Sequence, residues 1–342
     1  MDGTVAELKS RSTAFVVLNT SSACLVGISA ISNHPVETVC KTCSVCHRLK
    51  KRTSKYGLLP PKDPEVIPWH TLCIDLIGPY SIKQPKINGE EQEDLHLHCL
   101  TMIDPATGWF EIAEIPTKQA DDVSNILEMH WLTRYPVPTE VVMDRGREFA
   151  AEVTTMLASD YGLRRKVITT RNPQANGIVE RVHQVVHNML RTSGLADGTS
   201  MATYENYGFS GILAAVRRGV NSTIHTTTQA TPAQLVFGRD AILNVQFEAN
   251  WAFIKQRKQK MIIQNNVREN LARRTHTYSI GDKVMVKRNP NRKHGEDQFT
   301  GPFTVVRVYD NGTLRLAKTA ARGAVHQTWH IRNVDPITVD EN

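Results

Sequence analysis

The sequence predicts an α/β protein, in which a mixed five-stranded sheet with helices precedes a small C-terminal β-barrel. Between residues 71 and 192, three strand-like runs are followed by alternating helical and strand-like segments. Prolines crowd residues 60–68, just before this region, and short alternating strands with an Asn-Gly turn follow it. With 342 residues, the chain is long enough for two or three domains with a buried core.

We expect four segments. Residues 1–66 form an N-terminal region and a linker, which is marked by prolines because proline disrupts both helices and central strands. Residues 67–240 form the α/β domain, residues 241–276 a basic helical linker, and residues 277–338 the barrel.

In the α/β domain, the periodicity of apolar residues predicts the helices and strands, and Gly and Pro residues mark where they end. Gly78-Pro79 is expected to end the first strand, Pro136 to stop the first helix and Gly162 to close the second. The predicted strands are Thr71–Ile77, Leu95–Ile103, Trp109–Ile115, Glu140–Met143 and Arg164–Ile168. The predicted helices are Gln119–Tyr135, Glu148–Tyr161, about Ile178–Thr192 and Tyr204–Val220.

Beyond this domain, a long basic helical pattern runs from Val245 to Arg274. Strands are then expected at Tyr278–Val286, Gly301–Val308 and Thr313–Leu316, with Asn311-Gly312 as a hairpin turn. This succession of short strands is typical of a small barrel.

The charge of the chain is uneven. The formal net charge is +7, and residues 251–342 contain 17 Lys and Arg against 8 Asp and Glu. A basic C-terminal third suits a polyanionic substrate, although a merely soluble basic surface fits the charge alone equally well. Of six cysteines, three cluster at Cys40, Cys43 and Cys46, which indicates intracellular thiols or metal ligands rather than a disulfide framework. The apolar run from Ala14 to Ile31 is interrupted by polar residues, so we expect a core helix or a poorly bounded gene start there rather than a targeting signal or membrane span.

Three acids stand out by position. Asp75 lies inside an apolar strand, Asp144 directly follows another, and Glu180 begins a helix with 35 residues between it and Asp144. Mg²⁺ takes oxygen ligands, and two such ions can clamp the attacking and leaving oxygens of an in-line phosphoryl transfer. A lone acid in a strand is more often a paired structural residue, so the spacing of all three carries the hypothesis. Asp104, before Pro105, is expected to form a turn, and Glu148 to cap or orient its helix.

The motifs around these acids resemble those of integrases from gypsy-type LTR retrotransposons, within the D,D-35-E superfamily. They are Ile74-Asp75-Leu76-Ile77-Gly78-Pro79, Asp144-Arg145-Gly146-Arg147-Glu148-Phe149 and Asn172-Pro173-Gln174-Ala175-Asn176-Gly177-Ile178-Val179-Glu180-Arg181. The resemblance extends roughly from Cys40 to Pro336. It implies a ribonuclease-H-like catalytic core with two Mg²⁺ (or Mn²⁺) ions held by Asp75, Asp144 and Glu180. It further implies 3′-end processing and strand transfer of DNA, which need no ATP; the chain has no Gly-rich phosphate loop with Lys-Ser/Thr.

The family also has an N-terminal zinc domain, in which two His precede two Cys. Cys43, Cys46 and Lys50 align with its end, but the two upstream His are missing, so we predict weak zinc binding or none. An improvised site of three cysteines with His34 or His47 is the alternative. Lys50 belongs to a basic run that is expected to contact phosphates.

DNA contacts are predicted on two further segments. On the Ile178–Thr192 helix, Gln184, His187 and Arg191 share a polar face with Glu180, and a plain solvated face is the alternative. His183 and His187 are not predicted to ligate metal. In the basic C-terminal third, the predicted phosphate contacts are Lys255, Arg257, Lys258, Lys260, Lys283, Lys287 and Arg288. The barrel fits a protein-binding module equally well.

The expected partners are the element's DNA ends, target DNA, further copies of the chain and, through the barrel, chromatin; no membrane partner is expected. The expected location is the nucleus, after a virus-like particle. Two alternatives remain: a non-catalytic DNA-binding remnant of a decayed or captured element, and a ribonuclease-H-like nuclease without strand transfer.

Overall fold

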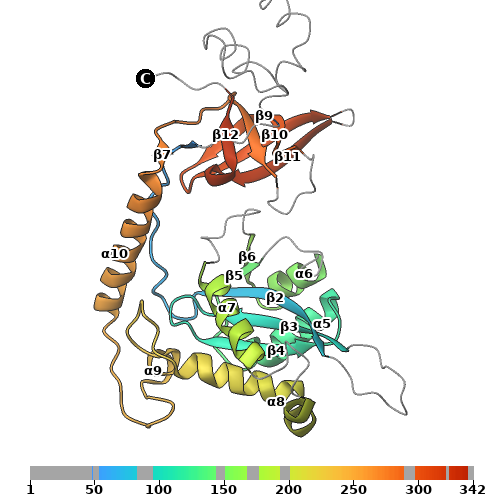
Figure 1. Cartoon of the computed structure of the whole chain (residues 1–342), viewed down its shortest axis with the longest axis vertical. Coiled ribbons are helices and arrows are strands. Elements are labelled where there is room, and N and C mark those ends of the chain that lie inside the picture. Colours follow the sequence, from blue (N-terminus) through green and yellow to red (C-terminus); the bar gives the residue numbers. More distant parts are fainter. Residues whose placement is uncertain are drawn as a thin grey trace, which may run out of the picture. The chain divides into compact units, whose positions relative to one another are not determined.

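The computed structural model describes residues 48, 54–82, 95–143, 151–167, 177–192, 201–288, 297–320 and 323–337. The chain divides into two compact units, Pro61–Asn265 and a second unit that combines Met1–Pro60 with Asn266–Asn342. Each unit contains its own five-stranded sheet (Figure 1). The four-segment division remains a prediction. None of the described helices is both long enough and apolar enough to cross a membrane.

The first unit is built on a mixed sheet with the strand order β4-β3-β2-β5-β6. The middle strand β2 is antiparallel to β3 and parallel to β5, so the strand direction reverses between β3 and β2. The strands are β2 (Thr71–Ile82), β3 (Leu95–Ile103), β4 (Phe110–Ile115), β5 (Glu140–Met143) and β6 (Arg164–Val167). This confirms the predicted order of three strands followed by alternating helices and strands.

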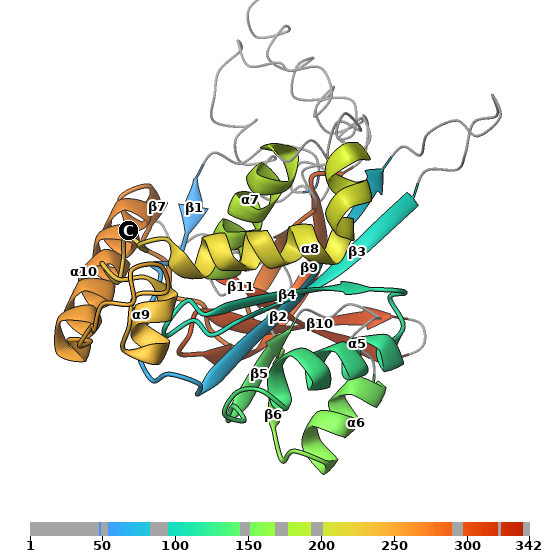
Figure 2. The ribbon, with the colours of Figure 1, turned by 90° about the horizontal axis from the view of Figure 1, so that it is seen from below.

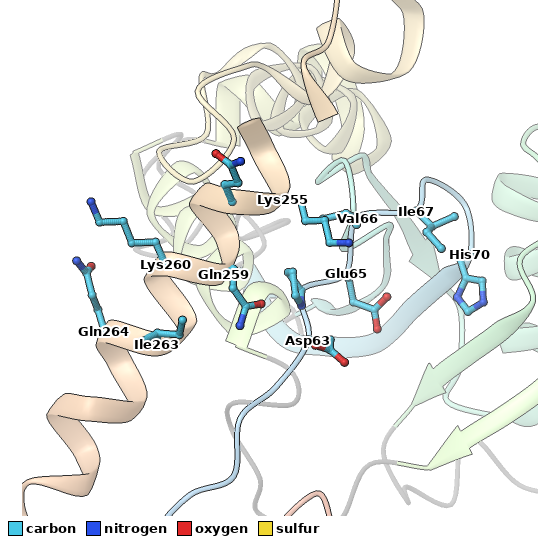
Figure 3. Close-up of a pocket in the computed structure, with 12 residues that line it drawn as sticks. Asp63, Glu65, Val66, Ile67, His70, Lys255, Gln259, Lys260, Ile263 and Gln264 are labelled. Atoms are coloured by element: carbon cyan, nitrogen blue, oxygen red, sulfur yellow. The ribbon is translucent and has the colours of Figure 1, made fainter. Parts of the chain in front are cut away.

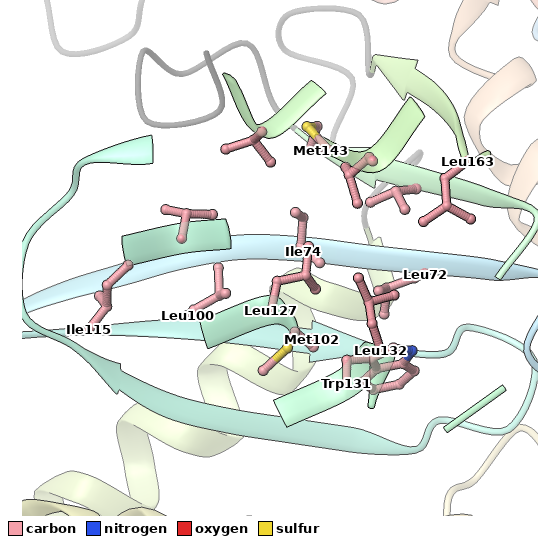
Figure 4. Packing of buried hydrophobic residues seen from close by; sticks show 14 of the residues in the cluster. Leu72, Ile74, Leu100, Met102, Ile115, Leu127, Trp131, Leu132, Met143 and Leu163 are labelled. Carbon is pink, nitrogen blue, oxygen red and sulfur yellow. The ribbon is translucent and has the colours of Figure 1, made fainter. Parts of the chain in front are cut away.

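Helices cover both faces of this sheet (Figure 2). Alternation along β2 sends Leu72 and Ile74 to one face, and Cys73 and Ile77 to the other. The first face packs against α5 (Ala120–Leu127) and α6 (Ala151–Ser159) in the cluster of Figure 4. The second packs against α7 (Gly177–Thr192) and α8 (Met201–Ser222).

Two predicted boundaries in this unit are wrong. β2 does not end at Gly78-Pro79 but continues to Ile82, with a shift in its pairing to β3 between Ile77 and Tyr80. The proline is tolerated because β5 pairs with β2 only at Thr71–Cys73, so Pro79 lies beyond the part of β2 that pairs with β5. The predicted helix Gln119–Tyr135 is α5 followed by a π-helical turn, η1 (Glu128–Leu132).

Two further helices follow α8, and the second of them continues past Asn265, the last residue of the first unit. The short α9 (Pro232–Phe237) begins with a capping box, in which Thr231 and Gln234 satisfy each other's backbone N–H groups. The basic α10 spans Trp251–Asn270, shorter than the predicted Val245–Arg274. It begins at Trp251 because the Asn250 side chain accepts a hydrogen bond from the Phe253 backbone N–H and so caps the first turn.

The second unit has an antiparallel sheet with the order β11-β10-β9-β8-β12. Its strands are β8 (Lys283–Lys287), β9 (Phe299–Tyr309), β10 (Thr313–Ala320), β11 (Gly323–His330) and β12 (Val334–Pro336). A short parallel pair joins β1 (Lys55–Tyr56) to β7 (Arg273–Arg274). The separate β-domain is confirmed, but its closure into a barrel is not, since no ladder joins β11 and β12 among the described strands.

The strand predicted at Tyr278–Val286 begins only at Lys283. The preceding residues form a turn in which the Asp282 carboxylate accepts a hydrogen bond from the Ser279 backbone N–H, and Gly281 has a φ of 101°. A side chain would be strained at that φ, so glycine favours a turn here rather than strand.

Candidate active site

Asp75 lies on β2 and on the sheet face that α7 covers, since it alternates in phase with Cys73 and Ile77. Its side chain is 32% exposed. The Asp75 Oδ1 atom accepts a hydrogen bond from the Leu76 backbone N–H at 2.9 Å. The carboxylate therefore has a fixed orientation and remains partly open to solvent.

Two polar side chains surround Asp75. Thr101 is its pairing partner on β3, and the Thr101 hydroxyl donates to the Asp75 backbone oxygen at 2.9 Å. His183, from α7, places Nε2 at 2.9 Å from that same hydroxyl oxygen. The other ring nitrogen of His183, Nδ1, lies 3.9 Å from Asp75 Oδ2.

The charge of His183 follows from its burial. Its side chain is 13% exposed, and burial, helped by the neighbouring His187, lowers its pKa to about 4. The imidazole is therefore neutral at pH 7, so its contact with Asp75 is not an ion pair under those conditions. Sequence reasoning missed this residue because a histidine on a polar helical face resembles a solvated one.

The contact between His183 and Asp75 fixes where Glu180 lies on α7. Glu180 is in the first turn of α7, exposed, and three residues before His183. Residues three apart lie one above the other on a helix, so Glu180 shares the face that meets β2. One turn further along, the ring centroids of His187 and Tyr80 are 5.5 Å apart, and His187 Nδ1 lies 3.3 Å from the Tyr80 hydroxyl.

Asp144 and Glu148 lie outside the described residues. Asp144 directly follows Met143, the last residue of β5. In the ladder between β5 and β2, Val142 pairs with Cys73, two residues before Asp75. No three His, Cys, Asp or Glu side chains within the described ranges are close enough together to hold a metal ion.

Asp104 is structural, which agrees with its predicted turn role. It is fully buried, and its carboxylate accepts hydrogen bonds from the Ala106 N–H at 2.9 Å and the Thr107 hydroxyl at 2.7 Å. The Trp69 backbone N–H donates to it at 3.3 Å. Burial raises the pKa of Asp104 against these hydrogen bonds. With its oxygens used inside the turn, Asp104 is poorly placed as a metal ligand.

The predicted DNA contacts differ in accessibility. On α7, Gln184, His187 and Arg191 are exposed, which fits either DNA contact or a solvated face. On α10, Lys255 and Lys260 are exposed, whereas the Arg257 guanidinium donates twice to the Thr226 carbonyl oxygen at 3.2 Å.

The prediction that Lys258 contacts a DNA phosphate is wrong. Its ammonium donates to the backbone oxygens of Glu65 at 2.7 Å, Pro105 at 3.0 Å and Ala106 at 2.8 Å. Burial lowers the pKa of Lys258 to about 8, although Asp104 and Glu65 oppose the shift. An ammonium that already donates three hydrogen bonds has no N–H left for a phosphate. Lys258 therefore joins α10 to the rest of the first unit and is not a candidate DNA contact.

Beside Lys258, an open groove of about 960 Å³ separates α10 from the extended residues that precede β2 (Figure 3). Its lining mixes acids, Asp63 and Glu65, with bases, Lys255 and Lys260. Opposite charges spread along an open wall give no concentrated metal or phosphate site.

In the second unit, Lys283 donates to the Thr304 hydroxyl at 2.6 Å, and Lys287 lies 3.8 Å from buried Asp335. Arg288 is exposed. The predicted zinc ligands Cys43 and Cys46, together with Lys50, lie outside the described residues.

Comparisons with known proteins support the fold of this chain. Residues 66–173 match the family model described as "Integrase core domain". A solved simian T-cell lymphotropic virus intasome in complex with PP2A regulatory subunit B56 gamma shares the fold, with a TM-score of 0.55 and 12% identity, over 90% of this chain and 91% of that chain.

Curated polyproteins match in sequence. The chain is 25% identical over 241 residues to the Pro-Pol polyprotein of feline foamy virus, covering 69% of this chain and 18% of the polyprotein. It is 24% identical over 204 residues to the Transposon Tf2-3 polyprotein of Schizosaccharomyces pombe, covering 59% of this chain and 14% of the polyprotein. The chain thus spans less than a fifth of the length of these relatives.

A mixed sheet with helices on both faces and an acid on its central strand defines a ribonuclease-H-like core. Residues 66–173 match the integrase core domain model, and the similar curated proteins are retroviral and retrotransposon polyproteins, so the comparisons support a retroviral-integrase-like domain here. The matched range contains Asp75 and Asp144 and ends before Glu180.

Proposed function

We propose that the protein is the integrase of a gypsy-type LTR retrotransposon, which trims the 3′ ends of element DNA and joins them to target DNA. The observation that carries the proposal is the contact of His183 with Asp75. Packing of α7 on the sheet and the hydrogen bond between His183 and Thr101 hold the helix whose first turn contains Glu180 over the strand of Asp75, although 104 residues lie between those two acids in the sequence. The third acid, Asp144, follows the neighbouring strand β5.

The two described acids suit a pair of Mg²⁺ or Mn²⁺ ions. Asp75 presents a partly exposed carboxylate on the face toward α7, and Glu180 is exposed on that helix. Carboxylate oxygens are the ligands that these hard cations prefer. Asp75, Asp144 and Glu180 would hold the ions, which when bound polarise the scissile phosphate and activate the attacking water or 3′-hydroxyl.

The chain's own residues would orient the site and hold DNA. Thr101 fixes the backbone of Asp75, and Leu76 fixes one oxygen of its carboxylate. Along α7, exposed Gln184, His187 and Arg191 continue from Glu180 and would contact the DNA backbone. Exposed Lys255, Lys260 and Arg288 would add phosphate contacts that carry no sequence information.

The proposal also covers the assembly of the chain and its location in the cell. The solved relative is described as an intasome. By analogy, the chain would act on DNA as a homo-oligomer in the nucleus, after a virus-like particle stage. The β-domain of the second unit would be a barrel that binds DNA or chromatin. Zinc at Cys43 and Cys46 would be weak or absent, because the family's two histidines are missing.

A strand-transfer assay tests this function, with the full chain, cognate element ends, a target plasmid and Mg²⁺. We expect joined products from wild type and from Glu248→Gln, a matched change of an exposed glutamate outside the site. Glu180→Gln should give none, because it removes a charged metal ligand. DNA binding without cleavage or joining by wild type would favour a non-catalytic remnant, and cleavage without joining would favour a simple nuclease.

A further inference from the structure

We infer that His183 is an additional metal ligand of this site, in which its Nδ1 atom binds the same ion as Asp75 and favours Mn²⁺ over Mg²⁺. The inference rests on the proposed function, since it concerns an ion at the proposed catalytic carboxylate. It adds a nitrogen donor to a site that is otherwise predicted to use oxygen alone.

Hydrogen bonding selects the tautomer of His183. The hydroxyl of Thr101 has one hydrogen, and that hydrogen is donated to the Asp75 backbone oxygen. The hydroxyl oxygen can then only accept from His183, which must carry its proton on Nε2. In the neutral ring, Nδ1 is left with a lone pair, and this is the nitrogen on the side of the Asp75 carboxylate.

The distance suits a shared cation better than a direct bond. At 3.9 Å, His183 Nδ1 and Asp75 Oδ2 are too far apart for a hydrogen bond. Two donors that each bind one ion at about 2.1 Å lie between about 3.0 Å apart, at a right angle, and about 4.2 Å apart, in line. The observed separation falls inside this range, so one ion can reach both atoms without a shift of α7 or β2.

The surroundings of His183 also argue against two simpler roles, those of a solvated surface histidine and of a histidine kept only for packing. A solvated histidine would not be 13% exposed with both ring nitrogens directed at β2 and β3. A histidine kept only for packing would need neither the hydroxyl partner nor a second nitrogen turned to a carboxylate. An ion at this position would give the Nδ1 lone pair a partner on the side of the Asp75 carboxylate.

The choice of metal follows from the donor. Mg²⁺ strongly prefers oxygen ligands and resists loss of its water, whereas transition-metal ions accept imidazole readily. An imidazole donor beside Asp75 should therefore strengthen Mn²⁺ binding while it adds little to Mg²⁺ binding.

Metal binding to the full chain tests the inference without use of enzyme activity. Mn²⁺ affinity is measured by electron paramagnetic resonance and Mg²⁺ affinity by competition, for wild type, His183→Asn, Thr101→Val and the control His326→Asn, a change of an exposed histidine in the second unit. We expect His183→Asn to weaken Mn²⁺ binding about tenfold or more, the usual scale for loss of a metal-site residue, with Mg²⁺ binding little changed. Thr101→Val should lose part of the Mn²⁺ preference because nothing then fixes the tautomer.

The outcomes separate the two proposals. Equal weakening of both metals in His183→Asn, or no weakening of either, would overturn the role of His183 as a ligand, because a structural role cannot discriminate between ions. If Asp75→Asn and Glu180→Gln lower the affinity for both metals in the same experiment, the proposed function stands even then. If those two variants bind both metals like wild type, the proposed metal site itself fails, and the inference fails with it.

Discussion

Replacement of Lys258 by methionine should destabilise the first unit, although the residue lies in a basic helix. The change removes three hydrogen bonds from an ammonium to the backbone oxygens of Glu65, Pro105 and Ala106. It also leaves the buried Asp104 carboxylate without the positive charge that lies near it.

The expected loss of stability is the contribution of the three hydrogen bonds minus the cost of burying the charged ammonium. Hydrogen bonds to charged groups contribute about 1.5–3 kcal/mol each, so the three together contribute about 5–9 kcal/mol. Burial opposes them: the fall in the pKa of Lys258 from 10.5 to about 8 corresponds to a cost of about 3 kcal/mol for the charged form. We therefore expect Lys258→Met to lower the free energy of unfolding by about 2–6 kcal/mol, which spans the range for a broken buried pair.

Urea unfolding followed by tryptophan fluorescence measures this loss as a fall in the midpoint at constant slope. The matched control is Lys260→Met, an exposed lysine on the same helix, which should change stability by no more than about 0.5 kcal/mol. Equal midpoints for the two variants would refute the reasoning, because the three hydrogen bonds would then contribute nothing.

The pH dependence of the unfolding free energy provides an independent test of the lowered pKa of Lys258. The folded chain has the lower pKa at Lys258, so between pH 8 and 10.5 the unfolded chain binds more protons there. Stability contributed by this site should rise as pH increases through that window and be level below it. The difference in unfolding free energy between wild type and Lys258→Met should accordingly grow with pH, and a constant difference would contradict the lowered pKa.

Two further predictions concern binding. Combined replacement of Lys255, Lys260 and Arg288 by glutamine should lower the slope of log affinity for DNA against log salt by about 0.9 for each phosphate that is no longer neutralised, whereas slopes that coincide with wild type would assign these residues to another role. Elemental analysis of the purified chain should find no stoichiometric zinc, and one tightly held zinc per chain that disappears in Cys43→Ser would restore a working N-terminal site.

Much of the fold can be predicted because apolar periodicity reports burial directly. The strands Leu95–Ile103 and Glu140–Met143 have the predicted bounds, as their alternation or β-branched content demands a sheet. Turn chemistry is equally local, which is why the role of Asp104 follows from Pro105 and Gly108. The course of β2 past Pro79 is not local: it depends on how far the neighbouring strand β5 extends.

The residues that sequence reasoning misses depend on contacts between distant parts of the chain. Lys258 resembles the other basic residues of its helix, yet its partners are at Glu65 and in the turn after β3. His183 does not stand out as a metal ligand because no acid or cysteine lies within two residues of it in the sequence. Only the packing of α7 on the sheet shows that it meets Thr101 and Asp75.

The central claim is that Asp75, on β2, is catalytic and that Asp104, which directly follows β3, is structural. The most direct measurement compares DNA cleavage and joining by Asp75→Asn and Asp104→Asn at a temperature at which circular dichroism shows both to be folded. We expect Asp75→Asn to keep wild-type stability and lose all activity, because a metal ligand is gone. We expect Asp104→Asn to lose about 1–3 kcal/mol of stability through its weakened turn and to keep most activity. Activity in folded Asp75→Asn, or its absence in folded Asp104→Asn, would contradict the account.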